Sequence, residues 1–181
     1  MDILVAQACR RGDVNALSAV IERGEDVNEG HEDNYTSLMH ASRLSSEGHL
    51  ECMRILINYG ANNVNARNDN QSTALHFAAE SYNIDAINLL LDNGAELDPV
   101  NNNNDTPLML TCYDNFTIIT RILIERGANL TIPDYHGNTC LHYAIENLNI
   151  DMIKLLFEYG ADDAIVNVFK TFYFFCYIII I

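Results

Sequence analysis

The sequence has no tryptophan, only three prolines, and ten lysine and arginine residues against 25 aspartates and glutamates, a formal net charge of −15. A chain this acidic repels the phosphate backbone of nucleic acids, so direct nucleic-acid binding is not expected. A basic or neutral protein surface is the easier partner. Hydrophobic residues make up 49% of the 181 residues, which is enough for the core of one domain and too many for wholesale disorder.

The five cysteines are an odd number and include no C-x-x-C pair. No apolar signal sequence follows Met1, because Asp2, Gln7, Arg10 and Arg11 interrupt the start. Both features favour free thiols in a reducing compartment, so we expect the cytoplasm or the nucleus.

Patterns that carry catalysis or metal binding are missing as well. The sequence has no G-x-S-x-G, no Gly-rich phosphate loop and no Ser/His/Asp grouping. Cys140 and His142 are close in sequence, but zinc sites bring their ligands in closed, paired sets. Carboxylate pairs such as Asp162-Asp163 fall in predicted turns, where aspartate is common for backbone reasons. We therefore expect no enzyme activity, no cofactor and no metal.

A repeat of about 33 residues runs through most of the chain. One marker is a glycine that closes an apolar run, with spacings of 36, 34, 33 and 33 residues, at Gly24, Gly60, Gly94, Gly127 and Gly160. A second marker is a threonine followed by x-Leu and then His or Met, with spacings of 37, 33 and 33 residues, at Thr36, Thr73, Thr106 and Thr139. Two independent markers that share one period predict tandem structural units.

Each unit has the pattern of a turn, a helix, a second turn and a second helix. The threonine is a helix N-cap, and Pro107 follows Thr106 at the first helical position, where its missing N–H costs nothing. The second helix carries apolar residues at helical spacing, as in Ile84, Ile87 and Leu90. The closing glycine fits a left-handed C-cap, and the polar residues after it are typical of a tight hairpin.

These markers resemble the ankyrin-repeat family, whose signature is T-P-L-H-x-A. The resemblance runs from about residue 2 to residue 163. It implies an all-α solenoid of about five helix-turn-helix repeats with short hairpin loops. The expected units are an N-terminal capping repeat at residues 1–30 and four repeats at about 31–67, 68–100, 101–133 and 134–163.

Two units depart from the family pattern. In the second unit, residues 45–47 (Ser-Ser-Glu) are extra, and we expect them to bulge the turn between its two helices. In the fourth unit, Thr111 and Cys112 replace the small paired alanines of other units, and Asn115 stands in the turn between the helices. We expect the fourth unit to pack least well.

The segment 164–181 is almost entirely apolar, and three interpretations of it stay open. It is a truncated sixth repeat, an incidental terminus, or a membrane anchor. A membrane span needs about 20 apolar residues. The unbroken run 172–181 has ten, and a longer span would include Asn167 and Lys170. The first two interpretations are therefore preferred, and membrane association is not expected.

The resemblance implies a non-catalytic scaffold that binds a protein or peptide partner, as an adaptor or an inhibitor. The acidic charge favours a basic partner. A scaffold tethered to a membrane by the tail is the alternative. We expect a monomer unless the tail drives association.

Residues that vary between equivalent positions of a solenoid are free to contact partners. The resemblance places these contacts on the hairpin tips and on the first helices, which line a concave face. The candidate tip residues are Glu32, Asp33, Tyr35, Asp69, Asn70, Asn102, Asn103, Asp105, Tyr135 and His136. The candidate helix residues are Arg43, Glu80, Tyr113, Asp114 and Glu146. Exposed aromatic side chains supply contact area at low entropy cost, so the strongest candidates are Tyr35, Tyr113, Tyr135 and His136.

Overall fold

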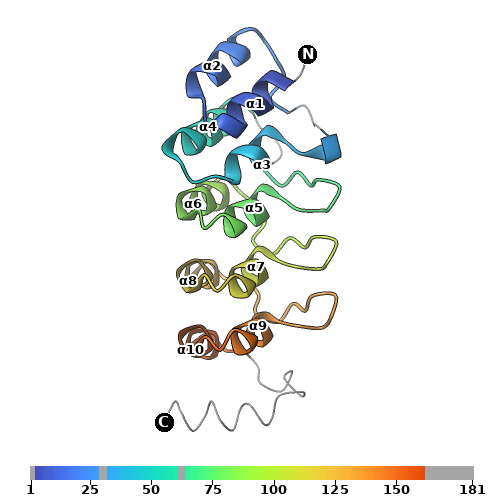
Figure 1. Cartoon of the computed structure of the whole chain (residues 1–181), viewed down its shortest axis with the longest axis vertical. Helices are drawn as coiled ribbons and strands as arrows, with labels where there is room; N and C mark the ends of the chain where they lie inside the picture. Colours follow the sequence, from blue (N-terminus) through green and yellow to red (C-terminus); the bar gives the residue numbers. More distant parts are fainter. Residues whose placement is uncertain (1–2, 29–31, 61–63, 162–181) are drawn as a thin grey trace.

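A computed structural model describes residues 3–28, 32–60 and 64–161, which form one column of stacked helix pairs (Figure 1). Within these ranges the chain has ten α-helices and no β-strand. The predicted all-α solenoid is confirmed. The predicted tail, residues 164–181, lies outside the described residues. Among the described helices, none has the length and apolar character that a membrane crossing requires.

The helices pair in sequence order, and each pair is one repeat. The first helices are α1 (Ile3–Arg11), α3 (Ser37–Ser42), α5 (Ala74–Glu80), α7 (Pro107–Tyr113) and α9 (Cys140–Glu146). The second helices are α2 (Val14–Glu22), α4 (Glu47–Asn58), α6 (Ile84–Asp92), α8 (Thr117–Glu125) and α10 (Ile150–Glu158). A short 3₁₀ helix, Glu32–Asn34, precedes α3. First helices stack on first helices, and the hairpin loops project beside them (Figure 1).

Local signals start and stop the helices as the sequence predicts. The Thr106 hydroxyl accepts a hydrogen bond from the Met109 N–H at 3.2 Å and caps α7, with Pro107 in its first turn. At the start of α5, the Thr73 N–H donates to Nδ1 of His76 at 3.0 Å, which closes a capping box. Gly94 follows α6 with φ of +86°, a conformation that a residue with a Cβ adopts at a cost.

The core lies between the two layers of helices and runs the length of the stack. Equivalent leucines of the second helices are fully buried, namely Leu56, Leu90, Leu123 and Leu156. Each contributes about 1.5–3 kcal/mol through the apolar surface it removes from water. Small buried residues, such as Ala78 and Ala144, let neighbouring first helices approach closely.

The fourth unit was expected to pack least well, and its two replaced residues are accommodated inside the core. Thr111 and Cys112 are both fully buried. The Thr111 hydroxyl donates to the Leu108 carbonyl at 2.8 Å and shares a 2.9 Å hydrogen bond with the Thr120 hydroxyl. Because these buried polar atoms have partners, the alanine-to-threonine replacement leaves no unsatisfied group.

The prediction that the extra residues of the second unit bulge the turn between its helices is wrong. α4 has 12 residues, whereas α6 has nine, so most of the extra length becomes an additional first turn of helix. This turn brings Gly48 against the first unit, where an added Cβ would stand 2.3 Å from the Gly12 carbonyl oxygen. A glycine at position 48 is therefore required by close contact between backbones.

Candidate functional site

Residues at or next to the ends of the first helices form one exposed row along the side of the column that carries the hairpin loops. Its members occupy equivalent positions of the five units: Arg10, Arg43, Glu80, Tyr113 and Glu146. Four of them were predicted from the sequence, and Arg10 was missed because the first unit lacks the threonine marker. The row is basic in the first two units and acidic or aromatic in the last three. We call the side formed by the first helices and the hairpin loops the first-helix face.

The first-helix face is closed over by side chains in the second and third units. Tyr35 stacks on His40 with ring centroids 5.3 Å apart and contacts Phe77 at 5.2 Å. The Arg43 guanidinium lies over the Phe77 ring at 5.6 Å, within the range of a cation–π contact. Arg10 contacts the His40 ring at 3.2 Å. Tyr35 is consequently half-buried, so less of its ring is exposed than the sequence suggested, and its contact with a partner stays a prediction.

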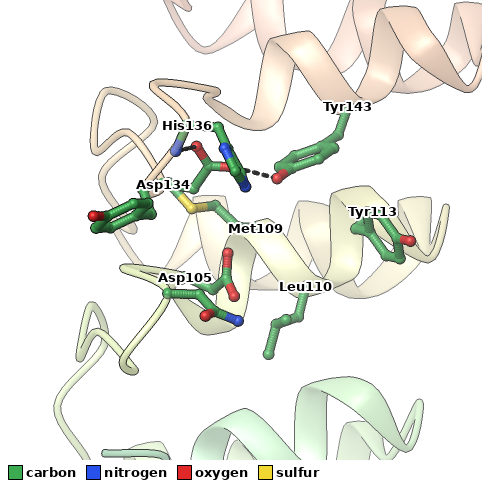
Figure 2. Close-up of a pocket in the computed structure, with 9 residues that line it drawn as sticks. Asp105, Met109, Leu110, Tyr113, Asp134, His136 and Tyr143 are labelled. Atoms are coloured by element: carbon green, nitrogen blue, oxygen red, sulfur yellow. Dashed lines mark hydrogen bonds between the residues drawn. The ribbon is translucent and has the colours of Figure 1, made fainter.

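A pocket of about 340 Å³ opens on the same face between α7, α9 and the adjoining hairpin tips (Figure 2). Five predicted residues line it: Asn103, Asp105, Tyr113, Tyr135 and His136. Four further lining residues were not predicted: Met109, Leu110, Asp134 and Tyr143. The structure thus brings one third of the predicted residues together, from two hairpins and one helix.

A smaller side chain contributes to the hollow. Leu110 occupies the helix position that holds Phe77 in α5 and Tyr143 in α9, so the smaller residue leaves space beneath the next repeat. Tyr113 and Tyr143 border that space with ring centroids 5.5 Å apart and nearly perpendicular planes. Tyr113 is 63% exposed and Tyr135 is 81% exposed, so both offer aromatic surface to a partner.

Asp134 is a buried carboxylate at the edge of the pocket. It accepts hydrogen bonds from the backbone N–H of His136 at 2.7 Å and from the Tyr143 hydroxyl (Figure 2). The backbone N–H of Asn138 donates a further hydrogen bond to it at 2.8 Å. Burial alone would raise the pKa of Asp134, but these donors outweigh it and hold the pKa below its usual value. Burial, together with the bond to Asp134, raises the pKa of Tyr143 well above its usual range. The pocket therefore keeps a negative charge at neutral pH.

Carboxylates of neighbouring repeats add to this charge. Burial raises the pKa of Glu80, and the charges of Asp114 and Asp105 raise it further, whereas Arg43 opposes the shift. Burial also raises the pKa of Asp114. Glu80, Asp105 and Asp114 therefore lie in a common negative field along α5 and α7. Glu146 extends the acidic surface at the end of α9.

Several predicted tip residues join one repeat to the next. The backbone N–H of Asp69 donates to the Asp33 carbonyl at 2.9 Å, and that of Asn102 donates to the Asn70 carbonyl at 3.0 Å. The Asn102 side chain also donates to the Asp69 carbonyl at 3.1 Å. These four residues stabilise the hairpin stack, a role that spacing within one unit does not indicate. Glu32 lies in the 3₁₀ helix Glu32–Asn34 beside them.

The histidines of the T-x-L-H marker serve the backbone. His76 is fully buried, and its Nε2 lies 3.1 Å from the Asp105 carbonyl of the next repeat. Burial lowers the pKa of His76 to about 4, so the ring is neutral at physiological pH. Within the described residues, no three His, Cys, Asp or Glu side chains gather as a metal site would need.

The stacked helix pairs and the variable first-helix face define a tandem-repeat protein. A family model of ankyrin repeats in three copies matches residues 5–101 and 96–167. The chain belongs to the ankyrin-repeat family, and the resemblance inferred from the sequence is confirmed. Ankyrin repeats are typically non-enzymatic protein-interaction modules.

Relatives come from viruses and animals. Over 131 residues the chain is 33% identical to an ankyrin repeat protein of Acanthamoeba polyphaga mimivirus, covering 72% of this chain and 17% of that protein. Over 138 residues it is 38% identical to neurogenic locus notch homolog protein 1 of Homo sapiens, covering 76% of this chain and 5% of that protein. An ankyrin repeat protein of fowlpox virus is 28% identical over 173 residues, 94% of this chain and 39% of that protein. The chain spans less than half the length of each of these relatives.

Proposed function

We propose that the chain binds a protein or peptide partner without catalysis, through the first-helix face and hairpin tips between α7 and α9. The observation that carries this proposal is the pocket itself. Five side chains predicted from the repeat pattern and the family resemblance, in two hairpins and one helix, line the same hollow of about 340 Å³. A hollow with exposed aromatic borders is the usual setting of binding hot spots.

The charge of this region supports a basic partner. Asp105, Asp114 and Asp134 lie in or beside the pocket, and their field attracts positive charge. An adaptor that links two proteins and an inhibitor that masks one both fit such a surface. The cytoplasm or the nucleus is the compartment we propose, because the four described cysteines are buried thiols.

Site-specific photo-cross-linking tests this proposal. A benzophenone amino acid is placed in the full chain at position 113, on the first-helix face, and at position 118, on α8. Position 118 is a matched control for position 113, because Ile118 is 58% exposed and Tyr113 is 63% exposed. Cross-linked proteins are identified by mass spectrometry after irradiation in cells.

We expect a defined set of adducts from position 113 and far fewer from position 118. Position 135, which is more exposed still, should give the same set as position 113. Adducts that form at position 118 and not at positions 113 or 135 would contradict the proposal and move the interface to the second helices.

A further inference from the structure

The α7–α9 pocket combines an apolar floor with aromatic borders. Met109 and Leu110 contribute aliphatic and thioether surface, and Leu110 is only half-buried. Figure 2 shows Tyr143 extending from α9 and Tyr113 from α7, and both line the pocket. The negative faces of aromatic rings attract cations, and their carbon atoms pack against alkyl chains. The borders therefore suit a long side chain that is apolar along its stem and positive at its end.

The charged groups of the pocket have the sign that such a side chain requires. Asp105 Oδ2 accepts a hydrogen bond from the Asn101 side chain at 3.1 Å. Among the described residues, no hydrogen bond to Asp105 Oδ1 accompanies this one. Asp134, in contrast, uses its oxygens on His136, Asn138 and Tyr143, so it contributes charge more than bonding capacity.

The field of Asp105 reaches the aromatic border as well. Burial is the largest cause that raises the pKa of Tyr143, and the charge of Asp105 adds to the increase. Asp105 and Tyr143 line the same pocket, so one ligand can contact both groups. An anion would meet two carboxylates here, and an apolar side chain would cover Asp105 without replacing the hydrogen bonds that water gives it.

We propose that the α7–α9 pocket binds the cationic side chain of an arginine or lysine residue from the partner. The alkyl stem lies against Leu110 and Met109, and the positive end lies between Asp105 Oδ1 and the rings of Tyr113 and Tyr143. This inference rests on the proposed function, because it names the partner chemistry for the same face. It adds that the pocket binds one basic side chain specifically, in addition to the general attraction between a basic partner and an acidic surface.

A titration with small peptides tests the pocket directly. The isotope-labelled full chain is titrated with acetyl-Ala-Arg-Ala-amide, with its lysine counterpart, and with the citrulline counterpart, which keeps the shape of arginine without the charge. Backbone amide shifts are followed by NMR. We expect saturable shifts at residues 105–113 and 134–143 with arginine or lysine, and at least tenfold weaker binding with citrulline. Equal binding of the arginine and citrulline peptides would overturn the proposal.

Two variants separate the pocket from the overall charge. Asp105→Asn removes the proposed partner of the cation with almost no change in volume and should weaken arginine binding at least fivefold. Asp85→Asn is the matched control, because Asp85 is exposed on α6 and the net charge changes equally. A similar loss in both variants would mean that only the net charge matters, and the proposal would fail.

Leu110→Phe fills the hollow with the residue that α5 carries at the equivalent position. It should abolish peptide binding while the melting temperature stays close to that of the wild type. If this variant unfolds, Asp105→Asn still decides the question, because it leaves the packing of α7 in place.

The two proposals can fail separately. Cross-links at positions 113 and 135, together with no charge selectivity in the titration, would leave the binding face in place and remove the cation pocket. Selective arginine binding at residues 105–113, together with cross-links only at position 118, would support the cation pocket and contradict the proposed protein-binding face.

Discussion

The two ends of the first-helix face use equivalent positions in opposite ways. In α3 and α5, Arg43 covers the Phe77 ring at 5.6 Å, and Tyr35 fills the space beside it. In α7 and α9, the equivalents of Arg43 and Phe77 are Tyr113 and Tyr143. The equivalents of Tyr35 and of His40 in α3 are Asp105 and Leu110, and a pocket opens. The backbone is the same in both places. The helix pairs therefore provide equivalent backbone positions, and the side chains at these positions determine whether the face is closed or has a pocket.

Charge follows the same division. The exposed row begins with Arg10 and Arg43 and continues with Glu80, Tyr113 and Glu146. Although the whole chain has a net charge of −15, this face is not uniformly acidic, because its first two units carry arginines in the exposed row. A basic partner is expected to meet repulsion near α1 and α3 and attraction near α5 to α9.

The largest expected effect concerns the core, where the two halves should behave alike. Leu56 in α4 and Leu123 in α8 are equivalent and fully buried. Leu56→Ala and Leu123→Ala should each lower the free energy of unfolding by about 2–5 kcal/mol through loss of burial and the cavity left behind. Denaturant unfolding followed by circular dichroism measures both. A loss under about 1 kcal/mol in only one variant would show that the interiors of the halves differ.

The second prediction separates units that carry His at the third helical position from units that carry Met. An unfolded histidine titrates near pH 6.5, whereas His76 in the fold titrates near pH 4. Between these values the unfolded chain takes up a proton that the folded chain does not, so stability falls as the pH falls. The loss at this residue is at most about 3 kcal/mol and is complete near pH 4.

His76→Met reproduces the residue found at positions 39 and 109 and removes this proton. Its free energy of unfolding should depend less on pH between 6.5 and 4 than that of the wild type, measured by urea unfolding at each pH. The same change at His142 should matter less, because burial lowers the pKa of this half-buried ring while solvent still reaches it. Parallel pH curves for the wild type and His76→Met would contradict the assignment.

The sequence predicted the fold well because its signals are local and repeated. The cap at Thr106, the C-cap at Gly94 and the apolar spacing of α6 each depend on a few neighbouring residues. Because these signals recur in successive units, each further unit supports the same predicted fold. The extra turn of α4 was missed because the same extra residues fit either a longer loop or a longer helix until the contact with Gly12 is known.

The candidate site was predicted in part, because half of its determinants lie between repeats. The positions of Tyr113, Tyr135 and Asp105 follow from counting within a unit, and these residues line the pocket. Burial of Tyr35 depends on Phe77 of the next unit, which counting does not show. The hollow itself could have been suspected by comparing equivalent positions, since Leu110 is the smallest of the side chains at its place in the last three units.

A third prediction compares two glycines with different reasons to be glycine. Gly48→Ala places a Cβ 2.3 Å from the Gly12 carbonyl oxygen and should cost about 1–3 kcal/mol by forcing α4 away from the first unit. Gly94→Ala meets nothing within 4 Å, and its cost of about 1–2 kcal/mol comes from φ of +86° alone.

Hydrogen exchange distinguishes the two effects. Gly48→Ala should speed amide exchange in α1 and α2 and leave α9 and α10 unchanged, whereas Gly94→Ala should act around α6 and α7. Faster exchange in α9 and α10 in the Gly48→Ala variant would mean that the stack unfolds as one unit and that its two ends are not separable.

The smallest expected effect concerns the rate at which a basic partner associates. Asp114→Arg removes negative charge beside the pocket and should slow association roughly two- to fivefold at low salt, whereas Arg43→Glu, two units away from the pocket, should speed it by a smaller factor. The double variant keeps the net charge at −15 but moves negative charge toward α3. If local charge guides the partner, the double variant should associate more slowly than the wild type, because the pocket between α7 and α9 loses its attraction. If the acidic residues serve only solubility, the double variant and the wild type should associate at the same rate. Stopped-flow measurements of the association rate, with the partner identified by cross-linking at position 113, decide between these two outcomes. They are made at low salt and at 1 M salt, where a Debye length of about 3 Å should remove the differences in rate between the variants.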